Sequence, residues 1–133
     1  MFMIVVDKRI DFCREILGSV NPPSAIDRSV AAGLKTVVFH AVKKAIEFGL
    51  PKTSTAICAD SDLGEGVLLR ARSMSLITAV TTDENDDQFK PAFNPVRIWD
   101  MATKFDTNLA VVRVNYNPES PKHVREKQQS AML

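Results

Sequence analysis

The chain has 133 residues, of which 45% are hydrophobic and 25% charged, and its formal net charge is +1. This balance is typical of one globular domain, and it excludes the basic surface by which proteins bind nucleic acids or anionic membranes. No apolar run approaches the roughly 20 residues of a membrane helix, and the first residues lack a basic leader. We therefore expect one cytoplasmic domain over residues 1–133.

The first predicted strand is the apolar run FMIVV at residues 2–6, which is followed at once by Asp7, Lys8 and Arg9. The run does not alternate between apolar and polar residues, which indicates a strand buried on both faces of a parallel sheet. Three later segments are also predicted as strands, at residues 55–59, 76–80 and 109–116.

Helices are predicted between and after these strands, because apolar residues recur there every three to four positions. Their ends are marked by capping residues, Gly or Pro. The predicted helices span residues 10–17, 25–48, 60 or 62 to 72, 95–105 and about 120–133. The last of them is polar and has few apolar anchors, so we expect it to form a C-terminal tail of the domain.

The helix over 25–48 has the clearest pattern. Ser24 is its expected N-cap, with Asp27 as the acidic partner of a capping box. Lys35 falls outside its apolar stripe, as do Lys43, Lys44 and Glu47. We expect this stripe to face the core, and it consists of Val30, Leu34, Val37, Val38, Ala41, Val42, Ala45 and Ile46.

Other buried positions follow from the same periodicity. In the third helix they are Leu63, Val67 and Ala71, and in the fourth they are Ile98, Trp99, Ala102 and Phe105. Cys13 and Cys58 are far apart and form no CxxC pair, which favours two buried thiols over a disulfide. Residues 81–94 are polar and acidic, and this segment is long for a connection between a strand and a helix.

The predicted order of elements is β-α-α-β-α-β-α-β-α. Strands that alternate with helices indicate an α/β fold with a parallel sheet and right-handed crossovers. Four βα units are about half of a (β/α)₈ barrel. The pattern therefore fits a half TIM barrel and a small open α/β sheet equally well.

Ligands of parallel α/β folds bind beyond the carboxyl ends of the strands. The polar residues at or near those ends are Asp7, Arg9, Asp60, Arg113, Asn115 and Asn117. Carboxylates there would accept hydrogen bonds from hydroxyl groups, and an arginine would bind a phosphate. The structural alternative is an Asp7–Arg9 ion pair and a helix cap at Asp60.

His40 and His123 lie on polar helix surfaces, and the sequence has no HxH or HExxH motif and no carboxylate cluster at ligand spacing. We therefore predict no dedicated metal site and no cofactor.

Several short segments resemble a bacterial aldolase-like TIM-barrel family, the 2-deoxy-5-keto-gluconate 6-phosphate aldolase-like domain of inositol catabolism, and more distantly tagatose 1,6-bisphosphate aldolases. In FMIVVDKRIDFCREILG, Asp7 and Arg9 match the family, and Lys8 replaces its usual His. In ICADSDLGEGVLLRAR, Asp60 and Gly64 match. The segment ITAVTTDENDDQF aligns with the third strand and its loop, and VVRVNYNPE is similar to the fourth.

This resemblance covers most of the chain but only the first half of the family's barrel. It implies an aldolase-like fold and the binding of a phosphorylated sugar. The family's Glu and Lys after the third strand fall on Thr81 and Thr82, and its fourth-strand Lys falls near Val111. The lysine that forms the Schiff base in related aldolases belongs to a later strand. The resemblance therefore implies depleted catalytic equipment.

Three hypotheses for function follow. The chain is a carbon–carbon lyase relative that retains phosphosugar binding or weak activity, a non-catalytic binding or regulatory module, or a truncated protein that keeps the fold. A half barrel would leave two open strand edges and an uncovered inner face. We therefore expect a homodimer or another oligomer, whereas an open sheet closed by its own helices would need no partner.

Overall fold

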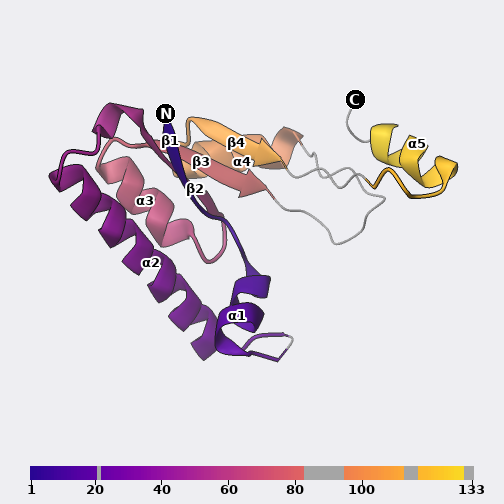
Figure 1. The fold of residues 1–133 in the computed structure, drawn as a ribbon, viewed down its shortest axis with the longest axis horizontal. Helices are drawn as coiled ribbons and strands as arrows, with labels where there is room; N and C mark the ends of the chain where they lie inside the picture. The colour runs from indigo at the N-terminus through magenta and orange to yellow at the C-terminus, as the bar shows by residue number, and fades with distance from the viewer. Residues whose placement is uncertain (21, 83–94, 113–116, 131–133) are drawn as a thin grey trace.

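A computed structural model describes residues 1–133 except 21, 83–94, 113–116 and 131–133 (Figure 1). Its strands are β1 (Phe2–Val6), β2 (Thr55–Asp60), β3 (Ile77–Thr82) and β4 (Leu109–Val112). Its helices are α1 (Ile10–Leu17), α2 (Ala25–Glu47), the 3₁₀ turn η1 (Lys52–Ser54), α3 (Glu65–Ser73), α4 (Pro95–Phe105) and α5 (Lys122–Ser130). The predicted order of strands and helices is confirmed.

The four strands form one parallel sheet in the order β1-β2-β3-β4. The sheet is open, and each strand lies beside its neighbour in the sequence. Because parallel crossovers are right-handed, this sequential order places the connecting helices on one face of the sheet. The α/β fold predicted from the alternation of strands and helices is therefore confirmed, as an open sheet of βα units.

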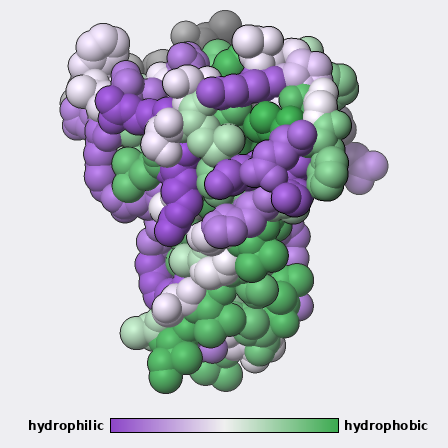
Figure 2. Space-filling model, turned by 90° about the vertical axis from the view of Figure 1, so that its left-hand side faces the viewer, coloured by the Kyte–Doolittle hydropathy of each residue, from purple (hydrophilic) through white to green (hydrophobic). Residues whose placement is uncertain are grey.

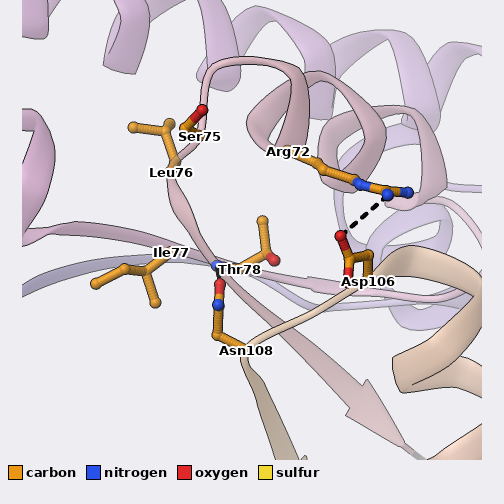
Figure 3. A pocket seen from close by; sticks show the side chains of 7 residues that line it. All are labelled: Arg72, Ser75, Leu76, Ile77, Thr78, Asp106 and Asn108. Carbon is orange, nitrogen blue, oxygen red and sulfur yellow. Dashed lines mark hydrogen bonds and ion pairs between the residues drawn. The ribbon is translucent and has the colours of Figure 1, made fainter.

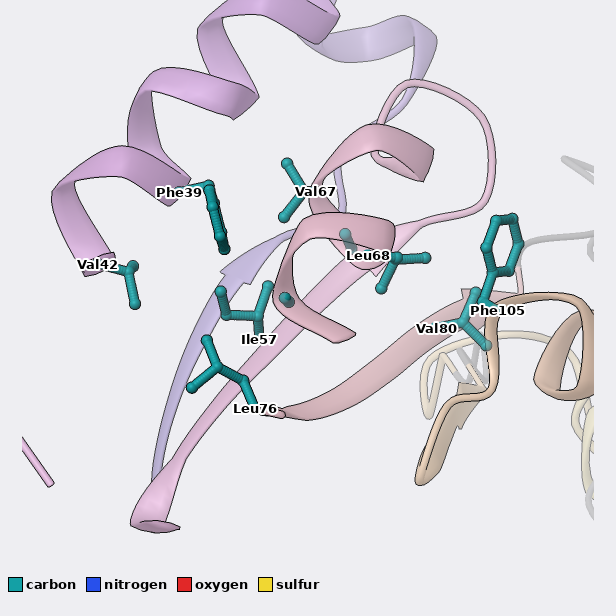
Figure 4. Packing of buried hydrophobic residues seen from close by; sticks show 10 residues of the cluster. Phe39, Val42, Ile57, Val67, Leu68, Leu76, Val80 and Phe105 are labelled. Atoms are coloured by element: carbon teal, nitrogen blue, oxygen red, sulfur yellow. The ribbon is translucent and has the colours of Figure 1, made fainter. Parts of the chain in front are cut away.

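The main core lies between the sheet and the helices α2, α3 and α4 (Figure 4). Residues of alternate parity in each strand face this core, including Ile57 and Ala59 of β2 and Val80 of β3. The helices contribute Phe39 and Val42, Val67, Leu68 and Ala71, and Phe105. A second, smaller cluster joins Cys13, Ala31 and Leu63 at the α1 side.

The expectation that β1 is buried on both faces is wrong. Phe2, Met3 and Val5 are 58%, 37% and 55% exposed, whereas Ile4 and Val6 pack against the core. The reason is that β1 is the end strand of the sheet and pairs with β2 alone among the described strands. An unbroken apolar run therefore predicts a strand but not its burial, because burial depends on which elements pack beside the strand.

The inward stripe predicted for α2 is also largely wrong. Val30, Leu34, Val37 and Val38 are all more than a third exposed, and Ala41 and Ala45 are exposed too. The buried side consists of Ala31, Lys35, Phe39 and Val42, with Ile46 packed beside them. The apolar surface of α2 is therefore wider than the face that the sheet and α3 cover.

Two side-chain predictions have opposite outcomes in α3 and α4. Leu63, Val67 and Ala71 are buried as expected, but the predicted start of the third helix at residue 60 or 62 is wrong. The helix α3 begins at Glu65, because Asp60 ends β2 and Leu63 lies in the turn that follows. In α4, Phe105 is buried and Met101 packs against the core, but Trp99 is 74% exposed, so its predicted burial is wrong. The side chain of Ile98 lies outside the described residues. Cys13 and Cys58 are both buried thiols that are not joined in a disulfide, as the sequence favoured.

The N-terminus of α2 has the predicted capping box. The backbone N–H of Asp27 donates to Ser24 Oγ at 3.1 Å, and the backbone N–H of Ser24 donates to the Asp27 carboxylate at 3.1 Å. Hydrogen bonds from the hydroxyl and the backbone N–H of Ser24 lower the pKa of Asp27. Both partners thus satisfy N–H groups that a helix start leaves without an intrahelical acceptor.

Replacing Ser24 by alanine is expected to lower the free energy of unfolding by about 1 kcal/mol, because the cap hydroxyl is lost. Urea denaturation followed by circular dichroism measures the change. Ser29→Ala, on the exposed surface of the same helix, is the matched control and should leave stability nearly unchanged. Equal losses in both variants would show that the cap contributes nothing particular.

Candidate functional site

The carboxyl ends of β1 and β3 bring two predicted rim groups, Asp7 and Arg9, to one residue that was not predicted, Thr81. Asp7 and Arg9 follow β1, and Thr81 lies near the end of β3. Thr81 Oγ1 donates to Asp7 Oδ2 at 3.4 Å, and Arg9 Nη2 donates to the Thr81 carbonyl oxygen at 3.3 Å. Asp7 and Arg9 are half-buried, while Thr81 is fully buried. A carboxylate and a guanidinium group therefore both contact Thr81 at the carboxyl end of the sheet.

Thr81 also reaches the middle of the sheet. Its hydroxyl lies 3.2 Å from the Sγ atom of Cys58 in β2, and both side chains are buried. Cys58 pairs with Val5 in β1 and with Ala79 in β3, so these side chains share the face away from α2 and α3. On this face of the sheet, Thr81 therefore lies next to Cys58, and Val5, Cys58 and Ala79 lie side by side in adjacent strands.

A buried ion pair lies beside the rim. Lys35 of α2 and Asp60 at the end of β2 are 2% and 0% exposed, and the lysine ammonium donates to the Asp60 carboxylate and to the carbonyl oxygen of Lys8. The other carboxylate oxygen of Asp60 accepts from the backbone N–H groups of Asp62 and Leu63 at 3.0 and 2.7 Å. This network joins α2, the end of β2 and the segment that carries Asp7 and Arg9.

A cavity of about 390 Å³ opens at the same end of β1. Its walls are mostly apolar, and they also include three charged residues, Asp7, Lys8 and Lys35. The lining residues are Val5, Val6, Asp7, Lys8, Phe12, Lys35 and Val38. The Lys35 ammonium lies 5.8 Å from the centre of the Phe12 ring. A few polar groups in an apolar concavity are the usual composition of a small-molecule site.

Lys8 supplies its backbone to this arrangement and directs its side chain elsewhere. Its ammonium forms an exposed ion pair with Glu15 of α1. The hydrogen bond from Lys8, together with its charge, lowers the pKa of Glu15. Because exposed ion pairs contribute little stability, the carbonyl of Lys8 matters more here than its charge.

The structure treats the six residues predicted for the site differently. It brings Asp7 and Arg9 together. It buries Asp60 in the ion pair with Lys35, where its carboxylate positions the neighbouring loop. Arg113 and Asn115 lie outside the described residues. Asn117 accepts the backbone N–H of Glu119 at 2.9 Å, which forms a tight turn after β4.

Sequence reasoning missed two residues of this cluster, Lys35 and Thr81. Lys35 lies four positions after Ala31 and four before Phe39, and both neighbours are buried. That spacing puts all three residues on one helix face. The burial of Lys35 could therefore have been predicted from its spacing to Ala31 and Phe39. Thr81 was expected to begin a polar loop, but β3 extends to Thr82 and carries it into the sheet.

A second cavity, of about 360 Å³, lies at the other end of the strands, by the amino ends of β3 and β4 (Figure 3). Arg72 and Asp106 face each other across it as an ion pair of 3.0 Å. Asn108 exchanges two hydrogen bonds of 3.0 Å with the backbone of Thr78. These groups fix the ends of α3 and α4 to the sheet, so we assign them to the fold.

Within the described ranges, no group of three or more His, Cys, Asp or Glu residues could hold a metal ion. No helix in the same ranges is long and apolar enough to cross a membrane. Comparison with protein-family models, with curated proteins and with solved structures finds no match to this chain. The site geometry and the sequence motifs are therefore the basis for a functional assignment.

Proposed function

We propose that this chain is an aldolase-like domain that binds a phosphorylated sugar at the carboxyl end of its parallel sheet, with little or no lyase activity. The observation that carries the proposal is the meeting of Asp7 and Arg9 at Thr81, beside the 390 Å³ cavity. Both residues belong to the motif that resembles the aldolase-like family, and both lie where ligands of parallel α/β folds bind.

The chemistry of the two side chains is complementary to such a ligand. A guanidinium group binds phosphate oxygens through charge-assisted and often bidentate hydrogen bonds. A carboxylate accepts hydrogen bonds from sugar hydroxyl groups. Asp7 and Arg9 are two residues apart, so a ligand that bridges them would present a phosphate and a hydroxyl to neighbouring points. The apolar walls formed by Val5 and Phe12 would contact its carbon skeleton.

The proposal of little or no lyase activity rests on the resemblance, which places the Schiff-base lysine of related aldolases in a later strand, and is supported by the contacts of Lys35. A class I aldolase needs an uncharged amine that attacks a carbonyl carbon and forms an iminium ion. Lys35 is the buried lysine at this edge, and its ammonium is held by Asp60 and the Lys8 carbonyl. An ammonium in such an ion pair has no lone pair to attack with, which supports a binding module.

Arg9→Ala is expected to weaken binding of a six-carbon sugar 6-phosphate about 10- to 100-fold, because one charge-assisted hydrogen bond contributes roughly 1.5–3 kcal/mol. Isothermal titration calorimetry measures the dissociation constant. Arg14→Ala is the matched control, since Arg14 is exposed and pairs with Asp11. The unphosphorylated sugar should bind weakly to the unaltered chain and equally weakly to Arg9→Ala.

Two results would reject the proposal. Unchanged affinity in Arg9→Ala would remove this residue from the site, and the absence of binding by any sugar phosphate would reject the ligand class. Incubation with substrate and borohydride tests the catalytic part separately. Retro-aldol activity with a lysine trapped by reduction would show that the chain is a class I aldolase after all.

A further inference from the structure

The sheet ends in two open edges. In the described part of the chain, β1 pairs with β2 alone and β4 pairs with β3 alone. Each outer edge therefore presents backbone N–H and carbonyl groups that can pair with a further parallel strand. Natural proteins normally cover or close such edges, because they template association with other chains.

Exposed apolar side chains gather at these two edges. The pairing register places Val5, Cys58, Ala79 and Leu109 in one row across the sheet, on the face away from α2 and α3. The central pair is buried, with Cys58 at 1% and Ala79 at 0% exposure. The end residues Val5 and Leu109 are 55% and 41% exposed. The row is thus buried at its centre and exposed to solvent at both ends.

The exposed apolar flank of α2 shares a cavity with the β1 edge. Val38 of α2 lines the same cavity as Val5 of β1, and Leu34 and Val30 precede it at helical spacing. Figure 2 views the molecule from the side that is on the left in Figure 1. Hydrophobic residues dominate its lower part, which in Figure 1 holds α1 and the N-terminal half of α2. Val5 at the β1 edge and Val38 on this flank of α2 therefore line one cavity, and the exposed apolar residues of α2 lie next to it.

We propose that a second copy of this chain covers these surfaces, with the β4 edge of each copy against the β1 edge of the other. A twofold axis parallel to the strands keeps all strands parallel and makes the two contacts identical. The result is eight parallel strands, the number that closes into a barrel. Both open edges are then paired, and Val5 and Leu109 enter a shared interior.

A second copy is favoured over an unrelated partner because one chain has both of the edges that need a neighbour, β1 and β4, and each can pair with the other. An added strand from another protein would cover one edge and leave the other open. In the dimer, β4 of each copy pairs in parallel with β1 of the other. Leu109 of one copy then lies beside Val5 of the other. The cavity beside Asp7 and Lys8 then lies next to the contact, so the partner would complete its outer wall.

The decisive experiment measures solution mass by light scattering for two single variants and their mixture. Val5→Asp alters the β1 edge and Leu109→Lys alters the β4 edge. Each variant alone is expected to have half the mass of the unaltered dimer, because every contact then contains a buried charge. An equimolar mixture is expected to recover the dimer, since a mixed pair retains one unaltered contact and combines Asp with Lys at the other.

Leu69→Asp is the matched control, because Leu69 is 46% exposed on α3, in the middle of the helical layer. It should remain a dimer, and circular dichroism tests whether all three variants are folded. The proposal is overturned if the unaltered chain is a monomer. It is equally overturned if Leu109→Lys stays a dimer while Val5→Asp dissociates, or if the mixture does not recover the dimer. A dimer that persists in Leu109→Lys, or a mixture that does not recover the dimer, would point to contact between like edges or between α2 helices.

Discussion

Replacing Lys35 by methionine is expected to lower the free energy of unfolding by about 3–5 kcal/mol, because it leaves the Asp60 carboxylate buried without its cation. Both side chains are 2% exposed or less, and methionine fills most of the volume of the lysine stem. The same variant should loosen the segment around Asp7 and Arg9, since Lys35 also holds the Lys8 carbonyl. Urea denaturation followed by circular dichroism measures the loss.

The matched control is Lys44→Met on the same helix, where the ion pair with Glu47 is exposed. Exposed pairs contribute little, so we expect no measurable change there. Asp60→Asn keeps the oxygen that accepts from Asp62 and Leu63 but removes the charge. The double variant Lys35→Met/Asp60→Asn should therefore be more stable than the sum of the two single losses predicts. Strictly additive losses would show that the pair is not coupled.

Replacing Gly64 by alanine is expected to lower the free energy of unfolding by about 1–3 kcal/mol, because the added methyl group has no room. A Cβ atom at Gly64 would lie 2.6 Å from the Asp60 carbonyl oxygen and 2.7 Å from Ala59 Cβ. The backbone between β2 and α3 would have to move, and it carries the turn that the Asp60 carboxylate caps. The change would therefore also disturb the Lys35 network.

Gly33→Ala tests whether this effect is specific to the close contact. Gly33 lies in the middle of α2, and a Cβ atom there would meet nothing within 4 Å. Because alanine favours a helix over glycine, this variant should gain about 0.5–1 kcal/mol. A loss at Gly33 as large as that at Gly64 would contradict the steric explanation.

The sequence alone determined the elements of the fold. Strand and helix positions follow from local information: the apolar runs, the Ser24 capping box, Gly18 as a helix stop and Pro95 at the first position of α4. The alternation of strands and helices then implied a parallel sheet, because only that arrangement lets each helix return the chain to the same end of the sheet. The positions of Asp7 and Arg9 at a carboxyl end follow from this order.

Which side chains are buried, and which of them contact one another, depends on the tertiary structure. Burial depends on neighbours distant in the sequence, so an apolar pattern could not reveal that β1 is an end strand, that Trp99 is exposed or that α2 is covered on one flank. The contact of Thr81 with Asp7 joins residues 74 positions apart. Lys35 is buried because Asp60, 25 positions away, supplies its counter-charge. Local sequence fixes conformation, whereas the pairing of charges and the covering of surfaces require the assembled sheet and helices.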